Sequence, residues 1–327
     1  MQTPRPRRLR RGWMLAWLLL LAGCCAGALA AVPELPRFRV LGTEHGLPSS
    51  QISRLVMDRD GYLWIASGDG LARYDGREFR IWRHDPDDPQ SLRCNYVQEL
   101  HIDARNRVWV ACEGGGLSML DAARGRFRHF NMATQPAMRS DEVFAIASRG
   151  DEVVFGTYAG GLYRVPADGR VQRIQGGDSE VDAMLDGAIT GLGFDAAGVL
   201  WIGTFKGMVR YDGKRASAYR LPAPTDALQR VAAVIALSDG LWVSSNGELY
   251  RLRHDGRWQR ADWTGALQRG VLCMAEDGNG GYWLGNGQGL WHKPADGALR
   301  RIGEGEAAVA GANVVESMLR DKEGGLW

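Results

Sequence analysis

The chain has 327 residues, 45% hydrophobic and 24% charged, which excludes a disordered polypeptide and fits a folded globular protein. Its formal net charge of +2 hides an asymmetry, because five arginines lie in the first eleven residues and no acidic residue precedes Glu34. Without residues 1–30, the chain has 35 basic and 38 acidic residues, a net charge of −3. This slightly acidic net charge excludes nucleic acid as the partner, since phosphate binding needs a concentrated basic face.

The N-terminal segment has the pattern of an export signal. A basic stretch precedes the apolar run from Trp13 to Ala22, and the segment ends in Ala28-Leu29-Ala30. This order predicts a secretory signal peptide over residues 1–30. Two alternatives stay open: a lipobox, Leu21-Ala22-Gly23-Cys24, that would make Cys24 the lipidated residue, and an uncleaved N-terminal anchor. Each places the rest of the chain in the periplasm or otherwise outside the cytoplasm, with inner-membrane anchoring as an option.

A repeat organises the rest of the chain. The segment Leu63-Trp64-Ile65-Ala66-Ser67 returns in six further variants, and the position of the Trp recurs at intervals of 45, 45, 47, 41, 41 and 44 residues. Each unit has an apolar alternating run, an Asp-rich turn, the Trp strand, a Gly-rich turn and two further strands. Four short strands with tight turns per 41–47 residues predict one blade of a β-propeller.

The whole of residues 37–327 is therefore expected to be all-β, a seven-bladed propeller with six complete four-stranded blades and an incomplete seventh. The sequence ends at Leu326-Trp327, inside a repeat, and we expect a partial product whose last blade lacks strands. Blades stack because a small sheet does not bury both faces alone. The residues expected to pack between blades are the repeated tryptophans, Trp64, Trp109, Trp201, Trp242 and Trp283. Val154 replaces Trp in the third unit, and the Gly that follows the Trp is expected to serve a tight turn or a positive φ.

The motifs resemble the two-component regulator propeller repeats of bacterial sensors. They are Gly46-Leu47-Pro48-Ser49-Ser50, Asp58 to Ser67, and Gly70 to Asp75. The resemblance implies the ligand-sensing, extracytoplasmic region of a signal-transduction receptor. Its output would be a histidine kinase or a diguanylate cyclase domain, which this sequence does not contain. It also implies a membrane span beyond the last residue, so that membrane contact arises through that span or the N-terminal segment, and a homodimer of the full-length receptor is a further expectation.

No pattern points to catalysis, a metal or a cofactor. The six histidines are scattered, and no metal-type spacing appears. The Asp-rich turns resemble calcium loops but are better explained by hairpin turn chemistry. Cys94, Cys112 and Cys273 follow the signal segment, and buried free thiols are favoured over a Cys94–Cys112 bridge.

The ligand is expected at one rim of the propeller. Residues directly after the Trp strands differ chemically while the framework repeats, which suits recognition by loops on a rigid scaffold. The candidate residues are Asp69, Glu113, Tyr158, Lys206, Asn246 and Gln288. Their chemistry favours a small polar molecule or a saccharide, although polar turns are common on any surface.

Two other functions stay open. One is a free-standing secreted propeller enzyme, such as a lyase or a quinone-dependent dehydrogenase. The other is a lipoprotein interaction scaffold attached through Cys24. The enzyme would need a catalytic or cofactor cluster, and the scaffold would need lipid on Cys24.

Overall fold

In the computed structural model the described residues are 39–223, 228–253, 255–267, 269–302 and 314–327. The segment 1–30, expected to be a signal peptide or an anchor, lies outside them. Val40–Trp327 form one unit.

The described residues form six antiparallel sheets, and each sheet consists of four strands consecutive in the chain. We call the sheets blades 1 to 6. Blade 1 contains β1 (Ile52–Met57), β2 (Leu63–Ser67), β3 (Gly70–Tyr74) and β4 (Phe79–Trp82). Blade 2 contains β5 (Val97–Ile102), β6 (Val108–Cys112), β7 (Gly116–Leu120) and β8 (Phe127–Phe130). Blade 3 contains β9 (Val143–Arg149), β10 (Glu152–Thr157), β11 (Leu162–Val165) and β12 (Gln172–Ile174). Blade 4 contains β13 (Ile189–Phe194), β14 (Leu200–Thr204), β15 (Gly207–Tyr211) and β16 (Ala216–Tyr219). Blade 5 contains β17 (Val231–Leu237), β18 (Gly240–Ser245), β19 (Glu248–Leu252) and β20 (Trp258–Arg260). Blade 6 contains β21 (Cys273–Glu276), β22 (Tyr282–Asn286), β23 (Gly289–Lys293) and β24 (Arg300–Arg301).

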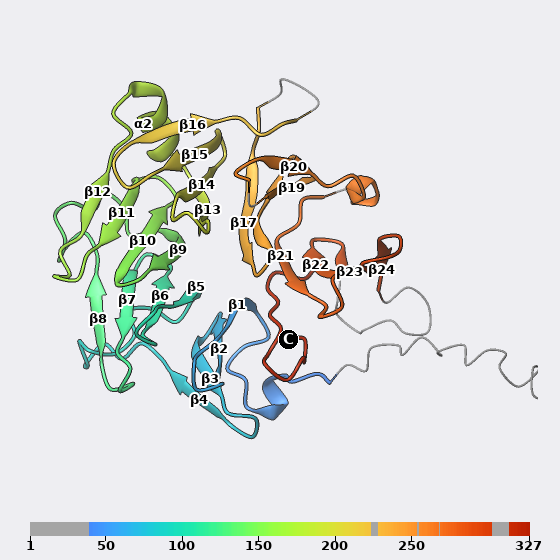
Figure 1. The fold of residues 1–327 in the computed structure, drawn as a ribbon. Helices are drawn as coiled ribbons and strands as arrows, with labels where there is room; N and C mark the ends of the chain where they lie inside the picture. The colour runs from blue at the N-terminus through green and yellow to red at the C-terminus, as the bar shows by residue number, and fades with distance from the viewer. Residues whose placement is uncertain (1–38, 224–227, 254, 268, 303–313) are drawn as a thin grey trace, which may run out of the picture. The chain divides into compact units, whose positions relative to one another are not determined.

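The blades are arranged around a common axis. The first strand of each blade lies innermost, and β1, β5, β9, β13, β17 and β21 are neighbours in that order, as Figure 1 shows. Short helices occupy connections between strands: η1 (Thr43–His45) precedes blade 1, α2 (Ser179–Leu185) joins blades 3 and 4, and η2 (Thr264–Ala266) joins blades 5 and 6. This is a β-propeller made of blades with simple up-and-down topology.

The prediction of a seven-bladed propeller with an incomplete seventh blade is wrong. The described residues form six four-stranded blades, and after β24 they contain only an isolated antiparallel bridge between Arg320 and Leu326. One bridged pair is not a sheet, because a blade requires several strands with a shared apolar face. The segment 314–327 instead packs on its neighbours: Met318 joins an apolar cluster of blade 6, and Leu319 joins one of blade 1.

The second strand of each blade supplies the core between blades. Trp64 is buried in a cluster with Val97, Leu100 and Val108 of blade 2. Val154, which stands in the position of Trp, packs on Ile189 and Ile202 of blade 4 in the same way. The other tryptophans at this position also contact the apolar cluster of the following blade or segment, as in Trp109, Trp201, Trp242 and Trp283.

The Asp of the turn before the Trp strand holds this packing in place. Asp58 Oδ2 accepts a hydrogen bond from the indole nitrogen of Trp64 at 2.8 Å, and the same bond joins Asp103 to Trp109 and Asp195 to Trp201. Asp58 Oδ1 also accepts from the backbone nitrogens of its own turn. One carboxylate therefore closes the turn and satisfies a buried indole donor.

The glycine after the Trp has a different role from the one expected. Gly203 does not have a positive φ. A Cβ atom on it would lie 2.5 Å from Cγ1 of Val231, the first residue of the inner strand of blade 5. Close approach of the next blade, rather than a turn, therefore requires the missing side chain.

Candidate functional site

One end of every blade carries the connections between blades. Ile52, at the start of β1, pairs with Ser67, at the end of β2, and Ser67 pairs with Gly70 at the start of β3. The equivalent pairs recur in blades 2, 4 and 5. The turn between the second and third strands therefore lies beside the connection from the preceding blade. We call this end of the propeller the rim face. All six predicted residues, Asp69, Glu113, Tyr158, Lys206, Asn246 and Gln288, lie in these turns, one on each blade.

The side chains of Asp69, Lys206 and Asn246 are engaged within the protein. Asp69 Oδ2 accepts hydrogen bonds from Nε and Nη2 of Arg83 at 3.1 and 2.9 Å. Lys206 Nζ donates to the carbonyl of Ala183 at 3.0 Å, which satisfies a carbonyl in the last turn of α2. Asn246 Nδ2 donates to the carbonyl of Leu228 at 2.7 Å. These side chains hold the rim connections in place, and a ligand would have to displace them.

The other three differ in what they present. Glu113 is exposed, and its backbone nitrogen donates to the carbonyl of Tyr96. Tyr158 is 51% exposed, and its ring contacts that of Phe144 with 5.4 Å between centroids. The backbone nitrogen of Gln288 donates to Asn286 Oδ1 at 2.8 Å. Tyr158 is therefore the predicted residue with the most apolar surface open to a ligand.

Sequence reasoning missed two exposed aromatic residues of the rim face. Phe144 and Phe205 are 42% and 46% exposed, and they lie at the rim ends of β9 and β14 in neighbouring blades. Phe144 is directed outward because β9 contains one extra residue in its pairing with β10, between Val143 and Ala145. A bulge of this kind redirects a side chain, and no alternation rule applied to the sequence places it.

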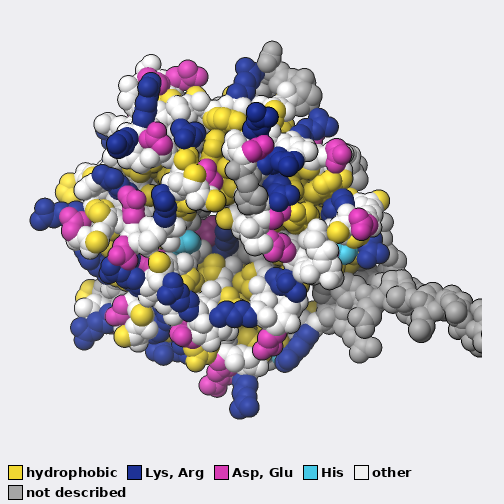
Figure 2. Space-filling model, viewed as in Figure 1, with side chains coloured by type: hydrophobic (Ala, Val, Ile, Leu, Met, Phe, Trp, Pro, Cys, Tyr) yellow, Lys and Arg dark blue, Asp and Glu magenta, His cyan; other side chains and the backbone are white. Residues whose placement is uncertain are grey.

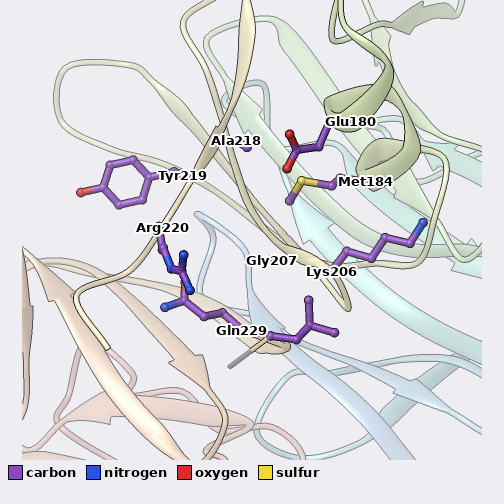
Figure 3. Close-up of a pocket in the computed structure, with 9 residues that line it drawn as sticks. Glu180, Met184, Lys206, Gly207, Ala218, Tyr219, Arg220 and Gln229 are labelled. Atoms are coloured by element: carbon purple, nitrogen blue, oxygen red, sulfur yellow. The ribbon is translucent and has the colours of Figure 1, made fainter. Parts of the chain in front are cut away.

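A pocket adjoins Lys206 on the rim face. It has a volume of about 470 Å³ and is formed by α2, the β14–β15 turn and the connection from β16 to β17. Glu180 and Met184 reach it side by side from α2, while Arg220 and Gln229 approach from the other side, as Figure 3 shows. The pocket combines charges of both signs with the apolar surface of Met184 and Leu228.

A second cavity of about 400 Å³ lies on the propeller axis. The innermost strands of all six blades line it, together with Ser317 and Met318, and Figure 2 shows a hollow near the middle of the face in view. Arg54 and Glu99 form an ion pair in it, with Nε 2.9 Å from Oε1. The next polar pair is His101 and Ser148, whose Nε2 and Oγ atoms lie 2.7 Å apart.

Burial alters the titration of the axial groups. It raises the pKa of Glu99, and the nearby Arg54 opposes this shift. Burial lowers the pKa of His101 to about 4, so that the ring is neutral at pH 7. The sequence motifs do not reveal this cavity, because each motif lies within one repeat whereas the polar residues of the cavity come from different repeats.

The structure contains a disulfide between Cys94 and Cys112, whereas the sequence favoured free thiols. The bond joins the connection before β5 to the end of β6, both on the rim face. Cys273 is free and buried, and burial raises the pKa of its thiol to about 12. Spacing did not identify the pair, because the two residues meet only once blade 2 has folded.

Within the described ranges, no group of three or more His, Cys, Asp or Glu side chains could hold a metal ion. Among those same residues, no helix has the length and apolar character needed to cross a membrane.

The fold and the repeated Asp–Trp bond define a β-propeller built from a sequence repeat. The family model described as "Two component regulator propeller" matches residues 46–69, and the resemblance suggested by the repeat motifs is confirmed. A 47-residue stretch is also 38% identical to Histidine kinase P4 of Formosa agariphila, and covers 14% of this chain and 3% of the kinase.

Solved structures show the same fold. The extracellular domain of a putative hybrid two-component system from B. thetaiotaomicron is similar with a TM-score of 0.70 and 18% identity, over 90% of this chain and 38% of that one. Virginiamycin B lyase from Staphylococcus aureus is similar with a TM-score of 0.63 and 10% identity, over 82% and 88% of the two chains. At these identities the likeness shows the fold alone. The chain thus spans less than two fifths of that extracellular domain and a small part of the kinase.

Proposed function

We propose that this chain is the ligand-sensing propeller of a bacterial signal-transduction receptor and that it acts outside the cytoplasm. The output, a histidine kinase or diguanylate cyclase domain, would belong to the full-length receptor and not to these residues. The match to the regulator propeller repeat and the likeness to extracellular domains of two-component systems support this proposal.

An extracytoplasmic location is supported by two features of the chain. Residues 1–30 have the composition of an export signal. The Cys94–Cys112 disulfide suits an oxidising compartment, because disulfides are rare where thiols are kept reduced. Expression in a Gram-negative host, followed by N-terminal sequencing of the periplasmic protein, tests this location. A first residue of Ala31 would support signal cleavage, and recovery of the whole chain from the cytoplasm would contradict it.

The exposed aromatic residues of the rim face are the single observation that carries the proposed ligand class. Phe144 and Tyr158 form an open ring pair on blade 3, and Phe205 is exposed on blade 4. Flat apolar rings with polar neighbours suit a saccharide, whose faces stack on aromatic rings while its hydroxyls bind polar groups. Glu113 on the neighbouring blade would supply a hydrogen-bond acceptor.

Calorimetric titration of the purified chain with a panel of oligosaccharides tests the rim. Phe144→Ala and Tyr158→Ala should each weaken binding of the best ligand by about two- to tenfold, since stacking contributes on the order of 0.5–1.5 kcal/mol per pair beyond area burial. Asp168→Ala, in the turn at the opposite end of blade 3, is the control and should bind like the wild type. If all three variants bind the ligand as tightly as the wild type does, the rim face is refuted as the ligand site.

A further inference from the structure

The axial cavity contains two charged side chains that the fold does not fully satisfy. Arg54 and Glu99 lie on the innermost strands of blades 1 and 2, and their side chains are 40% and 16% exposed although both face the propeller axis. Glu99 Oε1 is occupied, because it faces Arg54 Nε and accepts a hydrogen bond from the backbone nitrogen of Leu100 at 2.9 Å. Glu99 Oε2 and the two terminal nitrogens of Arg54 have no hydrogen-bond partner within the described part of the chain.

These open groups have complementary chemistry at one place. A guanidinium has five N–H donors and an ionised carboxylate accepts at both oxygens, so the pair offers donors and an acceptor side by side. Hydrogen bonds to charged groups are roughly twice as strong as neutral ones and gain further strength away from bulk water. The raised pKa of Glu99 has the same origin, since its charged form lacks solvation there.

The rest of the cavity wall limits the shape of an occupant. His101 and Ser148 close one side with a bond to each other, and the ring of His101 is neutral at pH 7. The opposite wall is apolar and comes from blades 4 and 5, with residues such as Leu192, Val234 and Ile235. The volume of about 400 Å³ lies within the range of about 300–1,000 Å³ typical of small-ligand sites.

We propose that the axial cavity binds a free aliphatic α-amino acid, with its carboxylate on Arg54, its ammonium on Glu99 and its side chain against the apolar wall. A simple carboxylate would be repelled by Glu99, and a simple amine would be repelled by Arg54. A zwitterion satisfies both charges and leaves the cavity net neutral. This site is separate from the rim face and does not depend on the sensor function proposed above.

Calorimetry with the full chain tests the proposal through matched ligands. L-valine should bind, whereas isovalerate, which lacks the ammonium, and isobutylamine, which lacks the carboxylate, should bind about thirtyfold more weakly or not at all. The comparison uses only the wild-type chain, so it stands even where a variant fails to fold. Absence of valine binding, or binding of either analogue as tightly as valine, would overturn the proposal, as would a neutral sugar that occupies the cavity more tightly than valine.

Variants locate the binding. Glu99→Gln keeps the size of the side chain and Arg54→Gln leaves a shorter, uncharged polar one; each should weaken valine binding about thirtyfold, with near-ultraviolet circular dichroism as the check on folding. Arg105 and Asp151 form an ion pair on the surface between blades 2 and 3, with side chains 53% and 50% exposed. Arg105→Gln and Asp151→Asn are therefore matched controls and should bind valine like the wild type. Unchanged affinity in a folded Glu99→Gln variant would place valine elsewhere and refute the site.

Discussion

Arg124 Nη2 donates a hydrogen bond to Asp58 Oδ2 at 3.0 Å and joins blade 2 to the turn of blade 1. The side chain of Arg124 is 8% exposed and that of Asp58 is fully buried. The guanidinium also lies over the ring of Trp64, 4.8 Å from its centroid. Asp58, Trp64 and Arg124 therefore form one buried unit between two blades, in which each polar group depends on the others.

Removal of one member of this unit should be costly. Arg124→Ala would leave a buried carboxylate without its cation, and such losses cost about 3–5 kcal/mol. Urea unfolding followed by tryptophan fluorescence should show a lower midpoint for this variant. Arg105→Ala, which breaks the exposed pair with Asp151, is the control and should cost less than about 1 kcal/mol. Similar losses for the two variants would show that Arg124 is not structurally coupled to the core.

The close approach of blades 4 and 5 gives a second prediction. Gly203→Ala places a Cβ atom 2.5 Å from Val231 Cγ1, and the inner strand of blade 5 would have to move. Overpacking of this kind costs about 1–3 kcal/mol. Gly125→Ala is a matched control, because no atom lies within 4 Å of its added Cβ. If both variants unfold at the same urea concentration, the interface between blades 4 and 5 is looser than the structure indicates.

The repeat allowed the strands to be predicted, because strand pairing within a blade is local. The expected Trp strand Leu63–Ser67 has the same bounds as β2, and the motif Gly70 to Asp75 covers β3 and one residue more. The number of blades was wrong, since the motif at Leu326-Trp327 predicted a further blade whereas Arg320 and Leu326 form only an isolated bridge. A sequence motif of this kind specifies a turn and the start of one strand. A sheet forms only where further strands are present to pair with that strand.

The candidate ligand surfaces were harder to predict, because they depend on contacts between repeats. The rim turns were located correctly, but the motif did not reveal that Lys206 and Asn246 bond to neighbouring connections. Arg54 and Glu99 are 45 positions apart, and only the ring arrangement brings them together. The bulge that exposes Phe144 is equally invisible in the alternation of apolar residues.

The Cys94–Cys112 disulfide should stabilise the chain in an oxidising solution. It closes a loop with a sequence separation of 18, for which the loss of unfolded-state entropy corresponds to about 3 kcal/mol. Dithiothreitol should therefore lower the urea midpoint of the wild type. The double variant Cys94→Ser, Cys112→Ser is the control, because reductant has no bond to break there. A midpoint of the wild type that does not respond to reductant would contradict a stabilising role.

His101 should make the stability of the propeller depend on pH. Its pKa is about 4 in the folded chain against an ordinary value of 6.5, because burial disfavours the charged ring. The unfolded chain therefore binds more protons between these two values, and the free energy of unfolding falls as the pH is lowered through this window. From pH 7 to pH 5 the loss due to His101 amounts to about 2 kcal/mol. Glu99, whose pKa is raised, contributes a slope of opposite sign.

The variant His101→Gln isolates this contribution, since Glu99 is present in both proteins and its effect largely cancels in their difference. Urea unfolding at pH 7 and pH 5 should show the wild type losing about 2 kcal/mol more than the variant. Above pH 7 the two curves should run parallel, because His101 is neutral in both the folded and the unfolded chain there. Parallel curves across the whole range would mean that the pKa of His101 in the folded chain stays close to its ordinary value of 6.5, in which case the axial cavity is far better hydrated than the burial of His101 indicates.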